Sequence, residues 1–202
     1  GELTVVKCPT TPNDPSQGVI NGLKSLFEKL NITGADLSLA VHSTTLVTNT
    51  VIERKGAKTA LATTKGFRDI LEIGRENRIT VYDLSEEKLR PLVPRRFRKE
   101  VDERVLYDGT ISRKLKKEQV RKLARQLLAA GVESIAISFL HSYSNPSHEK
   151  EVRKIFSEIA PKIQISISSE ILPEWREYER TSATVINAYA QPRTAHYMES
   201  IE

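Results

Sequence analysis

Apolar and polar positions repeat with two different periods along this chain, and together they predict an α/β fold. Apolar residues recur at spacings of three and four over residues 14–31, 115–131 and 144–161, the period of a helix with one buried face. Short, nearly continuous apolar runs between the helical segments predict buried strands. The predicted strands are residues 36–42, 58–64, 133–140 and 162–169. Strand–helix–strand units need crossover connections, which predicts a mainly parallel sheet with helices on both faces.

The first helix carries signals at both of its ends. Asp14 suits the N-cap, Pro15 the first helical position and Gln17 the return bond of a capping box. Asn31 and Gly34 are expected to end the helix. Its apolar stripe consists of Val19, Leu23, Leu26, Phe27 and Leu30.

Other glycines and prolines predict where further helices end. Gly56 is expected to terminate the helix that begins near residue 45, in the left-handed conformation. Residues 65–74 predict a short helix that stops at Gly74. The last helix is predicted over residues 181–202, with Pro192 kinking or interrupting it.

Residues 75–114 break this rhythm, because prolines, glycines and scattered charges replace the periodic pattern. Within them, VDERVLYDGTI alternates loosely around an Asp-Gly pair, which predicts a β-hairpin. We expect an irregular, β-containing excursion from the sheet here, as a flap or a subunit contact. Residues 86–125 hold 14 Lys and Arg against 7 Asp and Glu, in a chain of net charge +5. With Phe97 and Tyr107 as the only aromatics, this basic segment favours solvated surface or subunit contact over nucleic-acid binding.

The composition excludes several classes of protein. A chain of 202 residues is long enough to bury a real core. No stretch approaches the roughly 18 apolar residues of a membrane span. Cys8 is the only cysteine, which excludes internal disulfides and Cys-based metal clusters, so a cytoplasmic protein fits best. The opening segment, GELTVVKC, is typical of a strand already under way and therefore of a fragment or a processed piece.

Three polar clusters follow predicted strands, at residues 42–49, 63–69 and 141–145. The carboxyl ends of parallel strands meet at one edge of a sheet, where ligands of such folds bind. We therefore expect the three clusters to lie along one edge.

The segment HSTTLVTN supports two interpretations. Free N–H groups at a helix N-terminus, together with the hydroxyls of Ser43, Thr44 and Thr45, can hold an anion or a substrate amide. Asn49 would lie one turn beyond Thr45 on the same face. Alternatively, Ser43 or Thr44 is only an N-cap. The residues alone leave both open.

The segment TTKGFRD repeats the theme after the next strand. Lys65 could contact a phosphate and Arg68 a carboxylate, while Asp69 could hold Arg68 in place. A capped turn with a surface ion pair is the plainer interpretation, and the residues alone favour it.

The densest ionisable cluster is ILPEWREYERTS. If it is helical, Glu174, Glu177 and Tyr178 lie on one side, where paired carboxylates could act as general acid and base or hold Mg²⁺. A solvated helix face is the alternative, although Trp175 among the charges suggests partial burial. The sequence contains no HExxH, Walker-type or GxGxxG motif, and His141 is better suited to hydrogen bonding at a strand end than to metal ligation.

Four segments resemble the N-terminal region of the hydantoinase A/5-oxoprolinase family, which also includes the ATP-binding subunits of acetone and acetophenone carboxylases. They are VKCPTTPNDPSQGVINGL, STTLVTNTVIERKGAKTALATTKGFRDILEIGR, IAISFLHSYSNPSHE and SSEILPEWREYERTSATVINAY. The resemblance implies an actin- and sugar-kinase-like ATPase fold with ATP and Mg²⁺ as cofactors. ATP would phosphorylate a cyclic amide (hydantoin or 5-oxoproline) for hydrolysis, or a ketone-derived enolate for carboxylation, with a hydantoinase B-type partner subunit in an oligomer.

Two departures from the family pattern limit what the resemblance implies. The family's Asp-Gly-Gly-Thr phosphate loop would lie upstream of VVKCPTTP, and later segments of the ATPase core would follow residue 202. The 202 residues alone are therefore expected not to bind ATP competently. Ser43 stands where the family usually has glycine, and its side chain would occupy space next to a ligand.

The resemblance favours a substrate- or phosphate-facing site at the hydroxyl-rich segment. The predicted binding residues are His42, Thr44, Thr45, Asn49, Lys65, Gly66, Arg68, Asp69, Tyr178 and Arg180. The predicted catalytic residues are Glu174 and Glu177, and no metal ligand is predicted. Residues 1–202 are expected to form the N-terminal domain of a subunit that hydrolyses a cyclic amide. An alternative is a non-catalytic interaction domain, in which neutralising Arg95, Arg96 and Arg98 would weaken assembly and leave the fold intact.

Overall fold

A computed structural model describes residues 3–11, 14–75 and 89–201, and the chain divides into two compact units. The N-terminal unit comprises residues 1–48 and 193–202, and the α/β unit comprises residues 49–192. Two helices, α2 (Leu46–Ile52) and α7 (Glu177–Glu199), contribute residues to both units. Among the described residues, no helix combines the length and the apolar character needed to cross a membrane.

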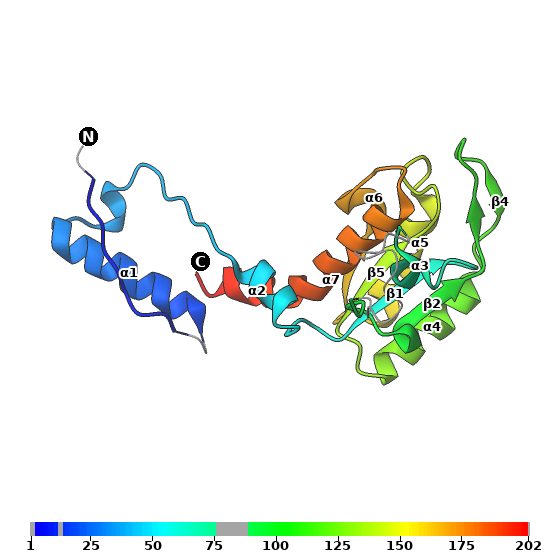
Figure 1. Ribbon diagram of the computed structural model, residues 1–202, viewed down its shortest axis with the longest axis horizontal. Helices are drawn as coiled ribbons and strands as arrows, with labels where there is room; N and C mark the ends of the chain where they lie inside the picture. The colour runs from blue at the N-terminus through cyan, green and yellow to red at the C-terminus, as the bar shows by residue number, and fades with distance from the viewer. Residues whose placement is uncertain (1–2, 12–13, 76–88, 202) are drawn as a thin grey trace, which may run out of the picture. The chain divides into compact units, whose positions relative to one another are not determined.

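A four-stranded parallel sheet forms the centre of the α/β unit (Figure 1). The strands are β1 (Thr59–Thr64), β2 (Arg98–Val101), β5 (Ser134–Ser138) and β6 (Gln164–Ile167), in the order β2-β1-β5-β6. Each neighbouring pair is parallel. β1 and β5 are buried at every position, which explains why their sequences are continuous runs of apolar and small residues. The predicted α/β fold with a mainly parallel sheet is confirmed.

Helices cover both faces of this sheet. On one face, α4 (Lys117–Ala129) and α5 (Ser147–Ile159) supply Leu127 and Phe156, which pack with Ile135 of β5. On the other face, Val185 of α7 packs with Leu61 of β1. Successive residues of a strand point to opposite faces, so β1 and β5 contribute to both clusters. Each large apolar side chain that is fully buried in them stabilises the fold by about 1.5–3 kcal/mol.

The segment predicted to leave the sheet is partly inside it. Arg98–Val101 is the edge strand β2, and it follows a 3-10 turn at Arg95–Phe97. The predicted hairpin is confirmed: β3 (Arg104–Val105) and β4 (Ile111–Arg113) pair antiparallel around Gly109, which has a φ of 85°. The hairpin extends away from the four-stranded sheet (Figure 1). Residues 76–88 of the predicted excursion lie outside the described residues.

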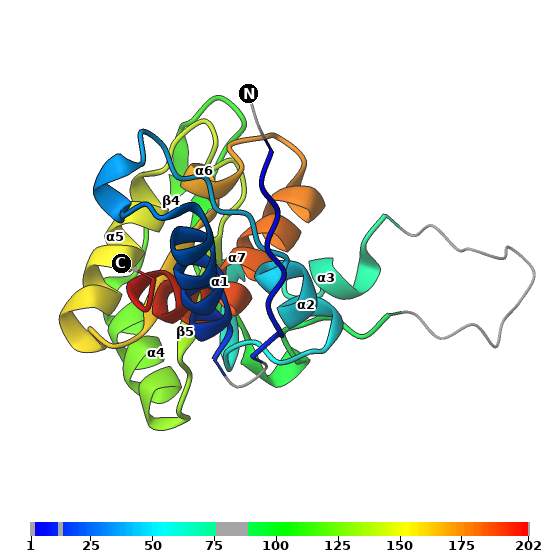
Figure 2. The same ribbon diagram turned by 90° about the vertical axis from the view of Figure 1, so that its left-hand side faces the viewer.

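The N-terminal unit contains α1 (Pro15–Leu30), followed by the three-residue 3-10 helix η1 (Gly34–Asp36). The Asp14 side chain accepts from the Ser16 N–H as predicted, and Asn31 ends the helix with a φ of 53°. The capping box is wrong, because the Gln17 side chain donates to Asn21 instead. Residues 3–11 run beside α1 in extended form (Figure 2).

Neither strand predicted in the N-terminal unit forms among its described residues. Residues 3–8 and 37–42 are extended but belong to no sheet. Leu39 and Val41 are 77% and 85% exposed, whereas the apolar run had predicted burial. No other strand of this unit supplies the hydrogen bonds that a buried strand requires, and an apolar run alone cannot provide them.

The helix α2 ends differently from the prediction. Arg54, not Gly56, adopts the left-handed conformation, with a φ of 53°. The N–H groups of Arg54 and Lys55 donate to the carbonyls of Val51 and Thr50, which is the bonding pattern of a Schellman cap. Gly56 is needed for space: a Cβ atom there would lie 2.2 Å from the Tyr189 ring.

The last helix, α7, begins four residues earlier than predicted and includes Glu177 to Arg180. Pro192 lies inside the helix and does not interrupt it. The short helix predicted over residues 65–74 begins five residues later, as α3 (Ile70–Ile73), and stops at Gly74 as predicted. The remaining predicted elements agree with the structure within a few residues.

Candidate functional site at the carboxyl edge of the sheet

Loops that follow β1, β2, β5 and β6 meet at the carboxyl edge of the parallel sheet. The backbone N–H of Leu140, just after β5, donates to the Thr64 hydroxyl at the end of β1 over 3.0 Å. Two of the predicted polar clusters, residues 63–69 and 141–145, therefore begin at neighbouring strand ends. The third cluster, residues 42–49, lies mainly in the N-terminal unit, and its place along this edge remains a prediction.

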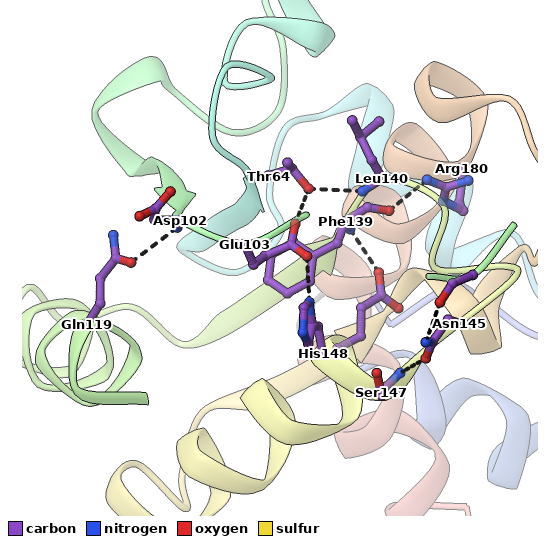
Figure 3. A network of polar contacts seen from close by, with 12 residues as sticks. Thr64, Asp102, Glu103, Gln119, Phe139, Leu140, Asn145, Ser147, His148 and Arg180 are labelled. Carbon is purple, nitrogen blue, oxygen red and sulfur yellow. Dashed lines mark hydrogen bonds and ion pairs between the residues drawn. The ribbon is translucent and has the colours of Figure 1, made fainter. Parts of the chain in front are cut away.

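A buried carboxylate, Glu103, joins the ends of these strands (Figure 3). It lies two residues after β2 and is 1% exposed. The Thr64 hydroxyl donates to one of its oxygens, and the other lies 2.7 Å from Nδ1 of His148 on α5. His148 is itself 7% exposed. This group fixes the hairpin loop against β1 and the start of α5.

A second buried carboxylate, Glu149, is fully enclosed and accepts three hydrogen bonds. The backbone N–H groups of Phe139 and Ser169 donate to it at 2.9 Å, and the Ser168 hydroxyl donates at 2.6 Å. It thereby joins the loop after β5 to α6 (Ser168–Ile171), which follows β6 directly. A buried carboxylate is tolerated only when such donors replace its hydration.

The third buried charge at this edge is Arg180 on α7, which is 1% exposed. Its guanidinium donates to the carbonyls of Phe139 at 2.8 Å and Glu174 at 2.6 Å, and lies 5.5 Å from the centre of the Tyr143 ring. Burial lowers the pKa of Arg180, while the charge of Glu149 acts in the opposite direction. Its Nε atom has no hydrogen-bond partner among the described residues.

The sequence had pointed to Arg180 but not to Glu103, His148 or Glu149. The sequence did contain a signal for His148 and Glu149. Glu149 and His148 stand three and four residues before Val152, so both lie on the apolar stripe of α5. An ionisable residue on a buried stripe requires a polar partner, so its position on the stripe indicates a buried polar interaction.

The loop after β1 presents Lys65 and Gly66 at the surface. The Gly66 N–H donates to the Glu100 carboxylate at 2.7 Å, with a Gly66 φ of 93°. Lys65 lines a polar cavity of about 480 Å³. The other lining residues are Glu100, Asp102, Lys116 and Gln119.

Asp69 does not hold Arg68, contrary to the prediction. Its carboxylate accepts two hydrogen bonds from Arg95, at 2.8 and 2.9 Å, and this pairing lowers the pKa of Asp69. The Nε atom of Arg68 is buried and has no hydrogen-bond partner among the described residues. Arg68 therefore remains a predicted ligand contact.

Arg98 has a structural place in the fold. Its side chain is 2% exposed, donates to the Val93 carbonyl and forms a 2.7 Å ion pair with Glu72. Neutralising Arg98 would therefore disturb the fold. The expectation that neutralising Arg95, Arg96 and Arg98 together leaves the fold intact is wrong. Several other cations of the basic segment also pair within the unit, including Lys117 with Glu151 at 2.6 Å.

Glu174 and Glu177 do not share a helix face. Glu177 is the first residue of α7, whereas Glu174 lies in the preceding loop, so the expected i, i+3 relation is wrong. Both side chains are exposed. Trp175 is 68% exposed, so the partial burial inferred for it is also wrong. Tyr178 is half-buried in the first turn of α7.

In the hydroxyl-rich segment, Thr44 acts as a helix cap. Its hydroxyl accepts from the Leu46 N–H at 3.2 Å, at the start of α2. His42 is hydrogen-bonded through Nε2 to the Tyr197 hydroxyl over 2.8 Å. Thr45 and Asn49 are exposed. Capping explains one hydroxyl here, and ligand contacts of His42, Thr45 and Asn49 remain predictions.

The polar cavity at Lys65 does not fit a polyphosphate by itself. Lys65 and Lys116 would attract phosphate, but the carboxylates of Glu100 and Asp102 face the same space. Asp102 accepts from both Lys116 and Arg113 and is already neutralised by them. The described residues also contain no group of three or more His, Cys, Asp or Glu side chains that could hold a metal ion.

Asp102 gives a pH-dependent prediction. Lys116 and Arg113 lower its pKa from an ordinary 3.8 to about 2. A carboxylate with a lowered pKa stabilises the fold at pH values above 3.8, and this contribution disappears as the pH falls from 3.8 to about 2. We expect Asp102→Asn to lower the urea midpoint at pH 7, with the deficit shrinking across that window. Glu118→Gln is the control, since Glu118 is 81% exposed; a deficit in Asp102→Asn that persists unchanged at low pH would contradict the assignment.

Comparison with known proteins gives a consistent set of similarities. Residues 1–160 match the family described as the Hydantoinase/oxoprolinase N-terminal region. Over 98% of its length the chain is 44% identical to an uncharacterized protein of Methanocaldococcus jannaschii, covering 29% of that protein. It is 33% identical to caprolactamase subunit alpha of Pseudomonas jessenii, covering all of this chain and 30% of the subunit.

Two solved structures share the fold. The crystal structure of the ATP-dependent caprolactamase from Pseudomonas jessenii superimposes on the whole chain with a TM-score of 0.88 and 32% identity, over 30% of that chain. The nucleotide-free structure of acetone carboxylase superimposes on 95% of this chain with a TM-score of 0.84 and 31% identity, over 29% of that chain. The chain thus spans about 30% of the length of these relatives.

Proposed function

Because the chain belongs to the hydantoinase/oxoprolinase N-terminal family, we propose that it is the N-terminal region of an ATP-dependent subunit that hydrolyses a cyclic amide after phosphorylation by ATP. The similarity to the caprolactamase carries this proposal, since it extends over the whole chain at a TM-score of 0.88. Caprolactam is a cyclic amide, as are hydantoin and 5-oxoproline. The substrate class is therefore a small ring that contains an amide.

The second candidate is a subunit of an ATP-dependent ketone carboxylase. It is supported by the similarity to acetone carboxylase, with a TM-score of 0.84 over 95% of the chain. In both reactions ATP activates a carbonyl-derived oxygen, so a shared fold for this region is chemically reasonable. The caprolactamase similarity covers more of the chain, and we place the cyclic amide first for that reason.

Within this proposal, the carboxyl edge presents Lys65 and Arg68 towards an anionic or amide-bearing substrate. Glu103, Glu149 and Arg180 hold the loops in place from beneath, because all three are buried and hydrogen-bonded. Glu174 and Glu177 are exposed carboxylates, and we keep them as the candidate catalytic residues. ATP and Mg²⁺ would be held mainly by other parts of the full-length protein.

A hydantoinase B-type partner subunit completes the proposed enzyme. The relative from Pseudomonas jessenii is described as a subunit, alpha, of caprolactamase, which supports an assembly of more than one chain. The basic segment at residues 86–125 offers exposed cations for such a contact, such as Arg96 and Lys114, which are both exposed.

The test is an ATPase assay on the full-length protein with its partner subunit. ATP hydrolysis is measured with caprolactam, 5-oxoproline, hydantoin, and acetone plus bicarbonate. Stimulation by a cyclic amide, with release of the ring-opened product, is expected; stimulation by acetone plus bicarbonate alone would instead support the carboxylase. No stimulation by any of them would contradict both candidates.

A pair of lysine variants links the result to the carboxyl edge. Lys65→Gln should lower the stimulated rate by tenfold or more, because the ammonium group faces the polar cavity. Lys122→Gln is the matched control, since Lys122 is exposed on α4. If the two variants have equal stimulated rates, Lys65 does not contribute to the site.

A further inference from the structure

A second cavity, of about 500 Å³, lies in the α/β unit on the face of the sheet covered by α7. Its walls come from the end of α2, from α3, from residues 89–92 and from α7. The lining residues are Val51, Ile52, Arg54, Leu71, Leu89, Arg90, Pro91, Leu92, Tyr178, Ser182, Val185 and Ile186. The base of the cavity is part of the hydrophobic core. Val185 belongs to the same buried cluster as Leu61, and the side chains of Leu71 and Leu92 pack against that cluster.

The polar groups of this cavity are few and all can donate hydrogen bonds. Tyr178 and Ser182 are one helical turn apart on α7, so their hydroxyls lie on the same side of the helix. Arg54 and Arg90 add two guanidinium groups, and none of the described lining residues carries a carboxylate. Arg54 is held in place, because it donates to the Arg90 carbonyl at 2.5 Å from its position at the left-handed end of α2.

Acidic residues near these walls have cationic partners of their own. Glu53 pairs with Lys55 at 2.8 Å, Glu72 pairs with Arg98 at 2.7 Å, and Glu179 pairs with Arg75. These three carboxylates are therefore paired with cations other than Arg54 and Arg90. Among the described residues, the cavity therefore combines apolar walls with the two guanidinium groups of Arg54 and Arg90.

Apolar side chains around this cavity remain open to water. Ile52 is 73% exposed and Leu89 is 92% exposed. Removal of exposed apolar area of this kind from water favours the binding of a ligand with an apolar body. A volume of about 500 Å³ lies within the range of roughly 300–1,000 Å³ that is common for small-molecule sites.

We propose that this cavity binds a small carboxylate with a compact apolar body. The apolar body would contact Leu71, Val185 and Ile186, and the carboxylate would accept hydrogen bonds from Arg54 and Arg90. Arginine is suited to this role because its planar donors match the two oxygens of a carboxylate. The site goes beyond the hydrolysis of a cyclic amide, and it can exist whether or not that proposal is correct.

The test uses the full-length protein and 4-fluorobenzoate, followed by fluorine NMR. Saturable binding at a single site with a submillimolar dissociation constant is expected. The neutral analogue 4-fluorobenzyl alcohol should bind at least tenfold more weakly, because it lacks the carboxylate. Absence of saturable 4-fluorobenzoate binding, including the case in which another part of the full-length protein fills the cavity, would overturn the proposal.

Three variants locate the binding. Ser182→Phe places a ring in the cavity and Arg90→Gln removes a positive charge, and each should weaken 4-fluorobenzoate binding at least tenfold. Arg125→Gln, at an exposed position of α4, should leave it unchanged. Unaltered melting temperatures would show that the variants are folded. Equal binding by Ser182→Phe, or equal binding of the acid and the alcohol, would overturn the site or its ligand class.

Discussion

Glu149→Ala is expected to destabilise the α/β unit by about 3 kcal/mol or more. The substitution removes one acceptor group and leaves the N–H groups of Phe139 and Ser169 and the Ser168 hydroxyl without their partner. Each orphaned buried donor costs about 1–3 kcal/mol, and water has little access because Glu149 is 0% exposed. Urea denaturation, monitored by circular dichroism at pH 7, measures the change.

A matched substitution on the same helix isolates this effect. Glu158→Ala removes an exposed carboxylate from α5 and should change the free energy of unfolding by no more than about 0.5 kcal/mol. Glu149→Gln should lie between the two, because one amide oxygen can still accept while the amide nitrogen faces a donor. If Glu149→Ala proves as stable as Glu158→Ala, the carboxylate does not hold the loops after β5 and β6.

The fold was largely predictable because periodicity reports burial directly. The buried strands β1 and β5 are continuous apolar or small-residue runs, and the stripe of α4 places Val120 and Leu127 inward. The same reasoning failed for residues 37–42. An apolar run shows that a segment is suited to burial, but it does not show whether another strand is present to pair with it. Leu39 and Val41 are exposed in the N-terminal unit for that reason.

The site was less predictable, because its partners are far apart in sequence. Asp69 lies next to Arg68, yet it pairs with Arg95, 26 residues away. Glu103 and His148 are 45 residues apart, and nothing local to either residue identifies the other. Adjacent charges can be found from spacing, whereas pairs formed by a crossover connection appear only when the sheet order is known.

The helix start of α7 shows how one boundary changes a functional reading. The interpretation of Glu174 and Glu177 as paired carboxylates required a helix through both residues, but the helix begins at Glu177. The same boundary places Arg180 in the first turn, facing the loop after β5. Arg180, which the sequence predicted to contact substrate, is therefore buried within the fold, and an experiment can distinguish the structural role from the binding role.

Arg180→Met is expected to destabilise the α/β unit by about 2–4 kcal/mol in the absence of any ligand. The substitution keeps an unbranched apolar stem but leaves the carbonyls of Phe139 and Glu174 without their donors. Urea denaturation measures the effect, and Arg176→Met, at an exposed position four residues before Arg180, serves as the control. If Arg180→Met retains full stability but loses activity, Arg180 contacts a ligand, as the sequence alone had suggested.

A double-mutant cycle gives the sharper form of this prediction. Glu149 accepts from the Phe139 N–H and Arg180 donates to the Phe139 carbonyl, so both side chains hold the backbone of one residue. Residues that share a partner in this way are expected to couple by about 0.5–3 kcal/mol. The variant Glu149→Ala/Arg180→Met should therefore lose less stability than the sum of the two single variants, because either change alone already frees the loop after β5. Strict additivity would mean that the two buried charges act on separate parts of the structure.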